Sequence, residues 1–179
     1  MGSTVALALT RELAPVFTSI MVAARAGSAM ATELGSMRIT EQIDALSTLA
    51  VNPVQYLVVP RVMATTLMVP LMTVLFDFVG MVGAYLVAIF LEGVDRGVFL
   101  ENTRWLIDND DVLQGVCKSL VFGCALALIS CFQGFYASGG AKGVGQATTR
   151  AVVASFVSIL VLDYFLSDVW LAVFPPGGR

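Results

Sequence analysis

The 179-residue sequence contains no histidine, which excludes histidine-dependent catalytic triads, histidine zinc sites and histidine pH switches. Charged residues are also scarce, at 13% of the chain, which is about half their share in an ordinary soluble domain. Acids outnumber bases, 13 to 10, so the chain lacks a basic surface that would neutralise nucleic-acid phosphates. Nucleic acid is therefore not expected as a partner.

Cysteine is rare as well, with three residues at Cys117, Cys124 and Cys131. The spacing of seven places them on one face of a helix, about 10 Å apart, which is too far for a disulfide. Small buried thiols usually act as packing residues, so we expect these three to be structural.

Apolar residues, by contrast, make up 58% of the chain, and the mean hydropathy is +0.86. A membrane-spanning helix needs about 20 mostly apolar residues, and four stretches qualify, namely 5–26, 56–91, 112–137 and 148–174. Their recurrence along the whole chain differs from a single secretory signal peptide. The sequence therefore predicts an all-α, polytopic transmembrane helix bundle that forms one domain over residues 1–179.

Three connections separate these stretches, at 27–55, 92–111 and 138–146. Lysine and arginine concentrate in or beside the first and third connections, whereas the second is rich in acids. Because cytoplasmic loops retain positive charge, we expect the first and third connections in the cytoplasm and the second outside. The bases that indicate this orientation are Arg25, Arg38, Arg61, Lys142 and Arg150.

Arg11 and Glu12 stand next to each other inside the first apolar stretch. Ionisable groups at this depth cost several kcal/mol unless they are paired or hydrated. Adjacent residues point about 100° apart on a helix, so the two side chains do not simply pair with each other. Either each is neutralised by a different neighbouring helix, or both line a polar pocket in which the arginine meets a lipid phosphate.

Asp77 and Asp163 are single carboxylates in the second and fourth stretches. A proton or sodium relay uses such groups, although relays tend to contain several carboxylates or histidines in series. An ion-coupled secondary transporter is therefore the alternative function, and Asp163 also lies near the end of its stretch, where an interfacial position would explain it.

The first connection contains a predicted short amphipathic helix. Thr40 is expected to cap its amino end, and Ile43, Leu46 and Leu49 form one apolar stripe before Asn52-Pro53 ends it. Helices that lie on a membrane surface usually carry lysine and arginine, whereas this one carries Glu41 and Asp44. Docking on a cytoplasmic protein is the favoured interpretation.

No nucleotide site is recognisable. The run Ala141-Lys-Gly-Val-Gly145 lacks the order of a phosphate-binding loop, so any ATP must be bound by another chain. We therefore expect a subunit that is not itself an enzyme and binds no cofactor or metal.

Several runs resemble one family, the permeases of the maintenance-of-lipid-asymmetry (Mla) ABC transporters, also called MlaE or YrbE-type permeases. The resemblance extends over nearly the whole chain and is most specific in the first forty or so residues. The matching runs are Leu9-Thr-Arg-Glu-Leu-Ala-Pro-Val16, Ala24-Arg-Ala-Gly-Ser-Ala-Met30, Ala31-Thr-Glu-Leu-Gly-Ser-Met-Arg38, Thr40-Glu-Gln42, Val51-Asn-Pro53, Pro60-Arg61, Lys118-Ser119, Ala147-Thr-Thr-Arg150 and Leu162-Asp163.

The resemblance implies a homodimeric permease of the bacterial inner membrane that transports phospholipid or a related lipid. Its implied partners are a cytoplasmic ABC ATPase that binds ATP and Mg, a periplasmic lipid-binding protein of the mammalian-cell-entry type, and a small cytoplasmic accessory protein. It also implies an amino-terminal interfacial helix and a further spanning helix ahead of the first residue here.

Two sets of site residues follow from the resemblance together with the patterns above. The implied lipid pathway comprises Arg11, Glu12, Leu13 and Val16. The implied coupling helix, within residues 31–53, contacts the ATPase through Glu41, Gln42, Ile43, Asp44, Leu46 and Leu49. A membrane scaffold without transport and an intramembrane enzyme are further alternatives, and copurification of an ATPase would separate the transporter from both.

Overall fold

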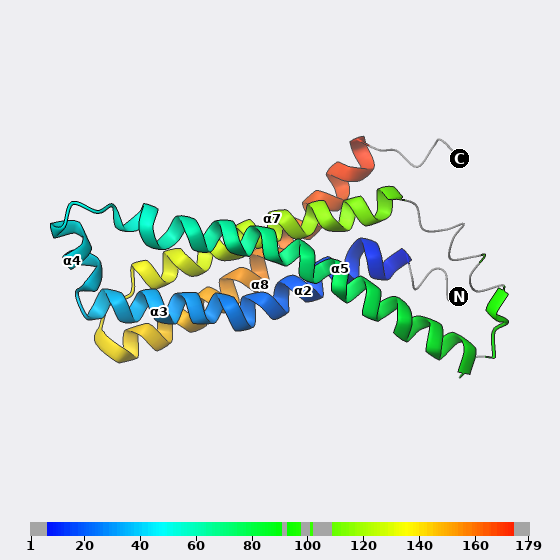
Figure 1. Ribbon diagram of the computed structural model, residues 1–179, viewed down its shortest axis with the longest axis horizontal. Helices are drawn as coiled ribbons and strands as arrows, with labels where there is room; N and C mark the ends of the chain where they lie inside the picture. Colours follow the sequence, from blue (N-terminus) through cyan, green and yellow to red (C-terminus); the bar gives the residue numbers. More distant parts are fainter. Residues whose placement is uncertain (1–6, 91–92, 98–100, 102–108, 174–179) are drawn as a thin grey trace.

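The computed structural model describes residues 7–90, 93–97, 101 and 109–173, and this part of the chain is almost entirely helical, without strands (Figure 1). Three short π-helical segments, labelled η, interrupt or precede the α-helices. The elements in chain order are η1 (Leu9–Leu13), α2 (Ala14–Val22), η2 (Ala23–Gly27), α3 (Ser28–Ile39), α4 (Gln42–Thr48), η3 (Val54–Val58), α5 (Val59–Phe90), α7 (Asn109–Phe135) and α8 (Gly140–Val173).

The first spanning helix runs without a break from Leu9 to Ile39, as η1, α2, η2 and α3 in succession. The helix therefore continues past residue 26, through the first part of the connection expected at 27–55. Within residues 28–39, Ala31 and Leu34 are fully buried, while Ser28 is half-buried and Thr32 is exposed. The hydroxyls of these two residues donate to helix carbonyls four residues earlier, so polar composition does not stop the helix.

Thr40 closes α3 instead of capping α4, contrary to the sequence-based expectation. Its hydroxyl donates to the Ser36 carbonyl oxygen at 2.8 Å, and Glu41 follows in a left-handed conformation with a φ of 61°. That turn directs α4 across the end of the bundle, so Ile43 faces inward and is only 2% exposed. Leu49, at the far end of α4, is 73% exposed.

The other spanning helices are close to expectation. The second runs through η3 and α5 from Val54 to Phe90, the third is α7, and the fourth, α8, begins at Gly140 instead of residue 148. The glycine-rich segment joins α8 because small residues let it pack closely on α3, where Gly35 approaches Val144. The expected ends at 5, 91 and 174, and most of the acidic second connection, lie outside the described residues.

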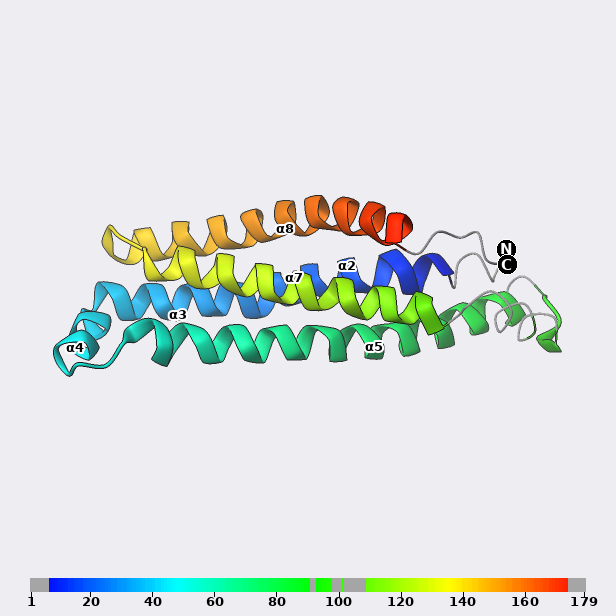
Figure 2. The same cartoon turned by 90° about the horizontal axis from the view of Figure 1, so that it is seen from above.

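Four helices in the described part of the chain are long and apolar enough to cross a membrane, which confirms the predicted all-α polytopic bundle. They run side by side, with α4 and the turn between α7 and α8 at one end (Figures 1 and 2). The start of η1, the start of α7 and the end of α8 lie towards the opposite end.

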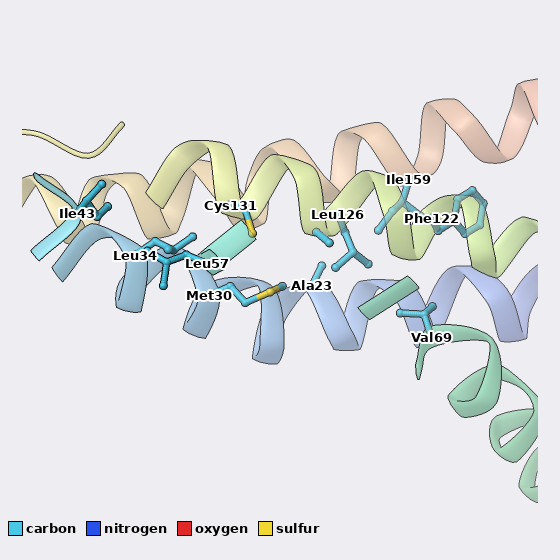
Figure 3. Packing of buried hydrophobic residues seen from close by; sticks show 11 residues of the cluster. Ala23, Met30, Leu34, Ile43, Leu57, Val69, Phe122, Leu126, Cys131 and Ile159 are labelled. Carbon is cyan, nitrogen blue, oxygen red and sulfur yellow. The ribbon is translucent and has the colours of Figure 1, made fainter. Parts of the chain in front are cut away.

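Helix α7 is the centre of the bundle, since it packs against the first helix, α5 and α8. Its small residues Ser119, Gly123 and Ala127 are buried, and small residues let helix backbones approach closely in lipid. The residues that α7 contributes to the apolar core lie between Phe122 and Cys131 (Figure 3). All three cysteines are free, as expected.

Gly134 marks the closest approach of α7 to α3. A Cβ atom at this position would lie 2.7 Å from the Ala31 carbonyl oxygen and 2.9 Å from the Ala31 Cα, both of which are backbone atoms that cannot rotate away. We therefore expect Gly134→Ala to push the two helices apart and to destabilise the protein by about 1–3 kcal/mol. Thermal unfolding of the purified protein in detergent measures this change.

Gly145 provides the matched control, because it is also helical but has no atom within 4 Å of its would-be Cβ. Gly145→Ala should leave the Tm unchanged or raise it, since alanine favours a helix by about 1 kcal/mol over glycine. Equal Tm values for the two variants would contradict the tight packing of α7 on α3.

Candidate functional site: a buried ionic cluster between three helices

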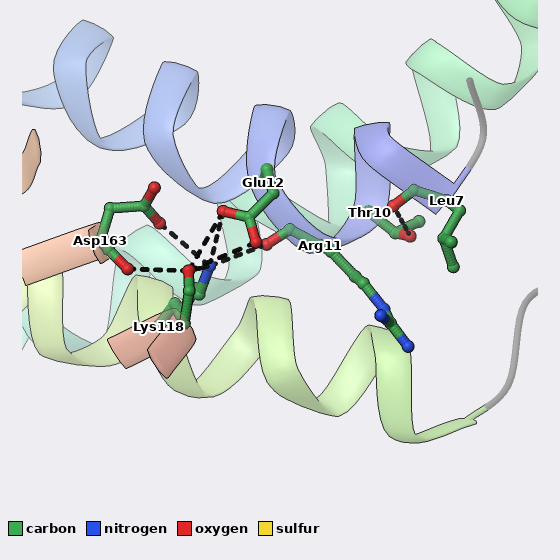
Figure 4. Close-up of polar contacts among 7 residues, drawn as sticks. Leu7, Thr10, Arg11, Glu12, Lys118 and Asp163 are labelled. Carbon is green, nitrogen blue, oxygen red and sulfur yellow. Dashed lines mark hydrogen bonds and ion pairs between the residues drawn. The ribbon is translucent and has the colours of Figure 1, made fainter. Parts of the chain in front are cut away.

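Lys118 on α7 lies at the centre of a polar cluster inside the bundle, with a side chain that is only 3% exposed. Its Nζ donates to Glu12 Oε2 at 2.7 Å and to Asp163 Oδ1 at 3.0 Å (Figure 4). It also donates to the Ser167 hydroxyl at 2.7 Å and to the Arg11 carbonyl oxygen at 3.3 Å. One ammonium group therefore connects η1, α7 and α8.

Ser167 completes the cluster from α8. Its hydroxyl donates to the Asp163 carbonyl oxygen, one turn earlier, at 2.8 Å, and lies within 3.5 Å of both Glu12 carboxylate oxygens. Glu12 and Asp163 come from different helices and share the single cation of Lys118. The cation thus holds two carboxylates together that would otherwise repel each other.

A second ion pair joins η1 to α7, two helical turns before Lys118 on α7. Arg11 donates from Nε to Asp111 Oδ1 at 2.7 Å, and its Nη2 also contacts that oxygen. Asp111 and Lys118 are seven residues apart, so they lie on the same face of α7. Of the two alternatives left open for Arg11 and Glu12, neutralisation by two different helices is not what the structure shows, because α7 supplies a partner for each.

The local backbone helps to aim both side chains at α7. Residues Leu9–Leu13 form the π-helical segment η1, in which hydrogen bonds run from i to i+5 and the helix is wider than an α-helix. The Arg11 side chain reaches towards the start of α7, while Glu12 points to Lys118 (Figure 4). Arg11 is 35% exposed and Asp111 is 2% exposed, so the guanidinium borders the surroundings while its partner does not.

The charges along the helices indicate that the cluster lies within the hydrocarbon layer. Residues 13–24 of the first helix and 151–162 of α8 are uncharged, and each stretch is about 18 Å long. A hydrocarbon core is about 30 Å thick, which is longer than these stretches. The cluster lies at one end of the stretches, and Arg25 and Arg150 lie at the other. The charges at both ends therefore cannot all lie outside the hydrocarbon core. Exposed arginines can extend to the headgroups, but the buried Lys118 cannot.

The other two residues of the predicted lipid pathway, Leu13 and Val16, lie on different faces of the first helix. Leu13 is 41% exposed and continues into an outward-facing stripe with Phe17, whose ring stacks on Phe76 at 6.5 Å. Val16 is partly buried against the core. The structure thus places Leu13 on the outer surface and Val16 in the bundle, on either side of the helix that carries Glu12.

The two carboxylates considered for ion coupling have different surroundings. Asp163 pairs with Lys118, so it belongs to the cluster and not to a solvated interface. Asp77 on α5 is half-buried, and its buried Oδ1 has no hydrogen-bond partner among the described residues. The structure therefore shows no chain of carboxylates linking Asp77 to Asp163 within the described residues.

Three residues of the two ion-pair sites are not among the site residues predicted from the sequence, namely Lys118, Asp111 and Ser167. In the sequence, Asp111 belongs to the acidic second connection, and Lys118 stands out only as part of a run that carries the family resemblance. A usable signal was present: Lys118 is the one charged residue between 112 and 137, and it follows Asp111 by two helical turns.

The predicted coupling residues lie at the opposite end of the bundle from the cluster (Figures 1 and 2). Glu41, Gln42 and Asp44 are exposed, and Asp44 Oδ1 accepts a hydrogen bond from Arg38 at 2.7 Å. Ile43 is buried and Leu46 packs partly on the core, so the predicted apolar stripe faces mainly the bundle, and Leu49 is its exposed end.

Comparisons with known proteins agree on one relationship. A family model described as Permease MlaE matches residues 1–169. A probable ABC transporter permease protein of Synechocystis is 48% identical over 170 residues, which cover 95% of this chain and 64% of the relative. The intermembrane phospholipid transport system permease protein MlaE of Haemophilus influenzae is 38% identical over 173 residues, which cover 94% of this chain and 65% of that protein.

A plant protein is related as well. The chloroplastic protein TRIGALACTOSYLDIACYLGLYCEROL 1 of Arabidopsis thaliana is 42% identical over 167 residues, which cover 93% of this chain and 48% of the plant protein. The chain therefore spans just under two thirds of the length of the bacterial relatives and about half of the plant relative.

Proposed function

Because this chain belongs to the MlaE permease family, we propose that it is the membrane-spanning part of an ABC transporter for phospholipid or a related lipid. Lipid would move between the bacterial inner membrane and a periplasmic lipid-binding protein of the mammalian-cell-entry type, driven by ATP and Mg on a separate ATPase subunit. The name of the Haemophilus relative, an intermembrane phospholipid transport system permease, supports this substrate class. The chain itself would bind neither nucleotide nor metal.

The observation that carries the proposal is the ionic cluster around Lys118, at a depth where charge is costly. Arg11 borders this cluster and is partly exposed, and two of its nitrogens are used by Asp111. Its other N–H groups remain available for a lipid phosphate, which guanidinium recognises well. The cluster would thus receive a headgroup while the apolar helix surfaces accommodate the acyl chains.

The first helix provides a mechanical connection between this cluster and an ATPase. It carries Arg11 and Glu12 near one end, continues to Ile39, and turns directly into α4 at the other end. We place α4 in the cytoplasm, against the ATPase, because the surrounding connections hold most of the bases. A displacement of α4 would then reach the lipid cluster along one continuous helix.

We further propose that two copies of the chain form the permease and that a small cytoplasmic accessory protein completes the assembly. In this arrangement, lipid both surrounds the spanning helices and is the transported substrate. The ion-coupled alternative requires a series of titratable groups, and the isolated position of Asp77 gives it less support.

Copurification tests the ATPase assignment most directly. The protein should be expressed with its natural partners in its own host and purified through a tag, and an ABC ATPase is expected to accompany it. In proteoliposomes, transfer of a fluorescent phospholipid to the periplasmic partner should require ATP and Mg and should be insensitive to proton and sodium ionophores. Transfer that continues without ATP and stops on addition of an ionophore would establish the ion-coupled alternative instead.

A further inference from the structure

An apolar groove lies on the outer surface of the bundle, along the side of α7 between α8 and the start of the second spanning helix. Its volume is about 550 Å³, within the range of small-ligand sites. Figure 2 shows α7 running between α8 and α5, and the groove follows α7 from Tyr136 to Leu128. Val54 and Val58 border it on one side, and Ala154 and Ser158 of α8 border it on the other.

A second recess continues the groove, and its lining is more polar and includes a basic residue. It has a volume of about 390 Å³ and shares Gln133 and Ala154 with the apolar groove. Thr149 and Arg150 form its far wall. The two recesses together therefore make one elongated depression, with an apolar body and one basic end.

The polar groups that line this depression have unused hydrogen-bonding capacity. Arg150 is exposed and forms no ion pair or hydrogen bond with any described residue. The Gln133 amide and the Ser158 hydroxyl, both half-buried, likewise make no hydrogen bond to the described part of the chain. A ligand with a phosphate near Arg150 and polar ester groups near Gln133 and Ser158 would satisfy all three.

The orientation of the depression matches that of a lipid in one leaflet. Arg150, Ala154 and Ser158 lie one helical turn apart along α8, in a line from the α4 end of the bundle towards its middle. Tyr136 lies at the same end as Arg150, because α7 and α8 run antiparallel, and both residue types are typical of the membrane interface. A headgroup at Arg150 would therefore leave its acyl chain pointing towards the bilayer centre.

We propose that this depression binds one anionic phospholipid of the leaflet on the α4 side, with its phosphate on Arg150 and one acyl chain along Leu128 and Phe132. This site is distinct from the Lys118 cluster, which lies inside the bundle and in the first half of α7, whereas the groove follows the last two turns of that helix. The proposal goes beyond the transport function, since a lipid permease can work without such a site. Charge complementarity selects a lipid as the occupant, because a purely apolar partner would leave Arg150 and Gln133 unpaired.

Quenching of a local tryptophan by brominated lipid tests the proposal. Tyr136→Trp introduces a fluorophore at the basic end of the groove, after Trp105 and Trp170 have been replaced by phenylalanine. The protein is reconstituted in phosphatidylcholine with increasing fractions of dibrominated phosphatidylglycerol or dibrominated phosphatidylcholine. Half-maximal quenching should need about fivefold less of the anionic lipid, which corresponds to about 1 kcal/mol for one arginine near a membrane surface.

Arg150→Gln should abolish this preference while leaving quenching by phosphatidylcholine unchanged. Arg25→Gln is the matched control, because Arg25 is also exposed, also lacks an ion pair among the described residues, and lines neither recess. Its variant should keep the fivefold preference.

Equal quenching by the two lipids in the starting protein would overturn the proposal, and so would a preference that survives Arg150→Gln. An absence of quenching by either lipid would also overturn it, since it would mean that a second copy or another helix covers the groove. Unchanged thermal unfolding of each variant confirms that a lost preference does not reflect misfolding.

Discussion

Lys118→Met is expected to abolish lipid transport and to destabilise the bundle by several kcal/mol, because it leaves two partly exposed carboxylates at membrane depth without the cation that they share. Lys118 is the shared cation of Glu12 and Asp163, at 2.7 Å and 3.0 Å, and its side chain is 3% exposed. Without it, two carboxylates from different helices face each other in an apolar bundle. A large drop in Tm together with loss of phospholipid transfer in proteoliposomes is the expected result.

An uncharged variant of the cluster distinguishes a role in stability from a role in lipid transport. The triple variant Glu12→Gln, Lys118→Met and Asp163→Asn removes all three charges at once, and replacing a complete buried ion network with neutral groups is often tolerated or stabilising. It should recover a Tm near that of the starting protein but remain inactive in lipid transfer. Normal transfer by the triple variant would show that the cluster only holds the helices together.

Leu49→Asp is expected to release the ATPase from the complex or to uncouple ATP hydrolysis from lipid. Leu49 is the exposed end of the α4 stripe, whereas Ile43 and Leu46 pack on the bundle. A charge desolvated in the ATPase contact without a partner costs several kcal/mol, and each 1.4 kcal/mol is a tenfold loss of affinity. ATPase copurification and lipid-stimulated hydrolysis measure the two outcomes.

The conservative variant Leu49→Met is the control for this prediction. It retains an apolar side chain of similar size, so both copurification and stimulation should remain near the starting values. Leu46→Asp, which the sequence alone would select, is a weaker test because Leu46 also packs against the core and its loss disturbs the bundle itself. Starting values for both measurements in Leu49→Asp would leave the coupling role of α4 without support.

The boundaries of the helices show where the sequence-based prediction failed within a correct fold. The apolar stretches predict four spanning helices, but the polar residues of 28–39 and the glycines of 140–146 are typical of connections. Both segments are helical because their buried faces pack on each other, as at Gly35 and Val144. Composition along one segment does not reveal that a second segment will cover its inner face.

The candidate site shows a similar division. Arg11 and Glu12 could be identified from sequence because ionisable residues stand out in an apolar stretch. Their partners could not, since the Glu12–Lys118 contact joins residues 106 positions apart. Burial of Ile43 also depends on the left-handed turn at Glu41, which directs α4 back across the bundle.

Hydropathy and length by themselves determined an all-α membrane protein with four spanning helices in the part of the chain that the structure describes, because the thickness of a bilayer imposes about 20 apolar residues on each helix whatever its neighbours are. The motif runs determined the family in the same local manner. The tertiary structure alone decided which charges neutralise each other, since that depends on which helix faces lie together at a given depth. It placed Asp111 and Lys118 on the single face of α7 that meets Arg11 and Glu12.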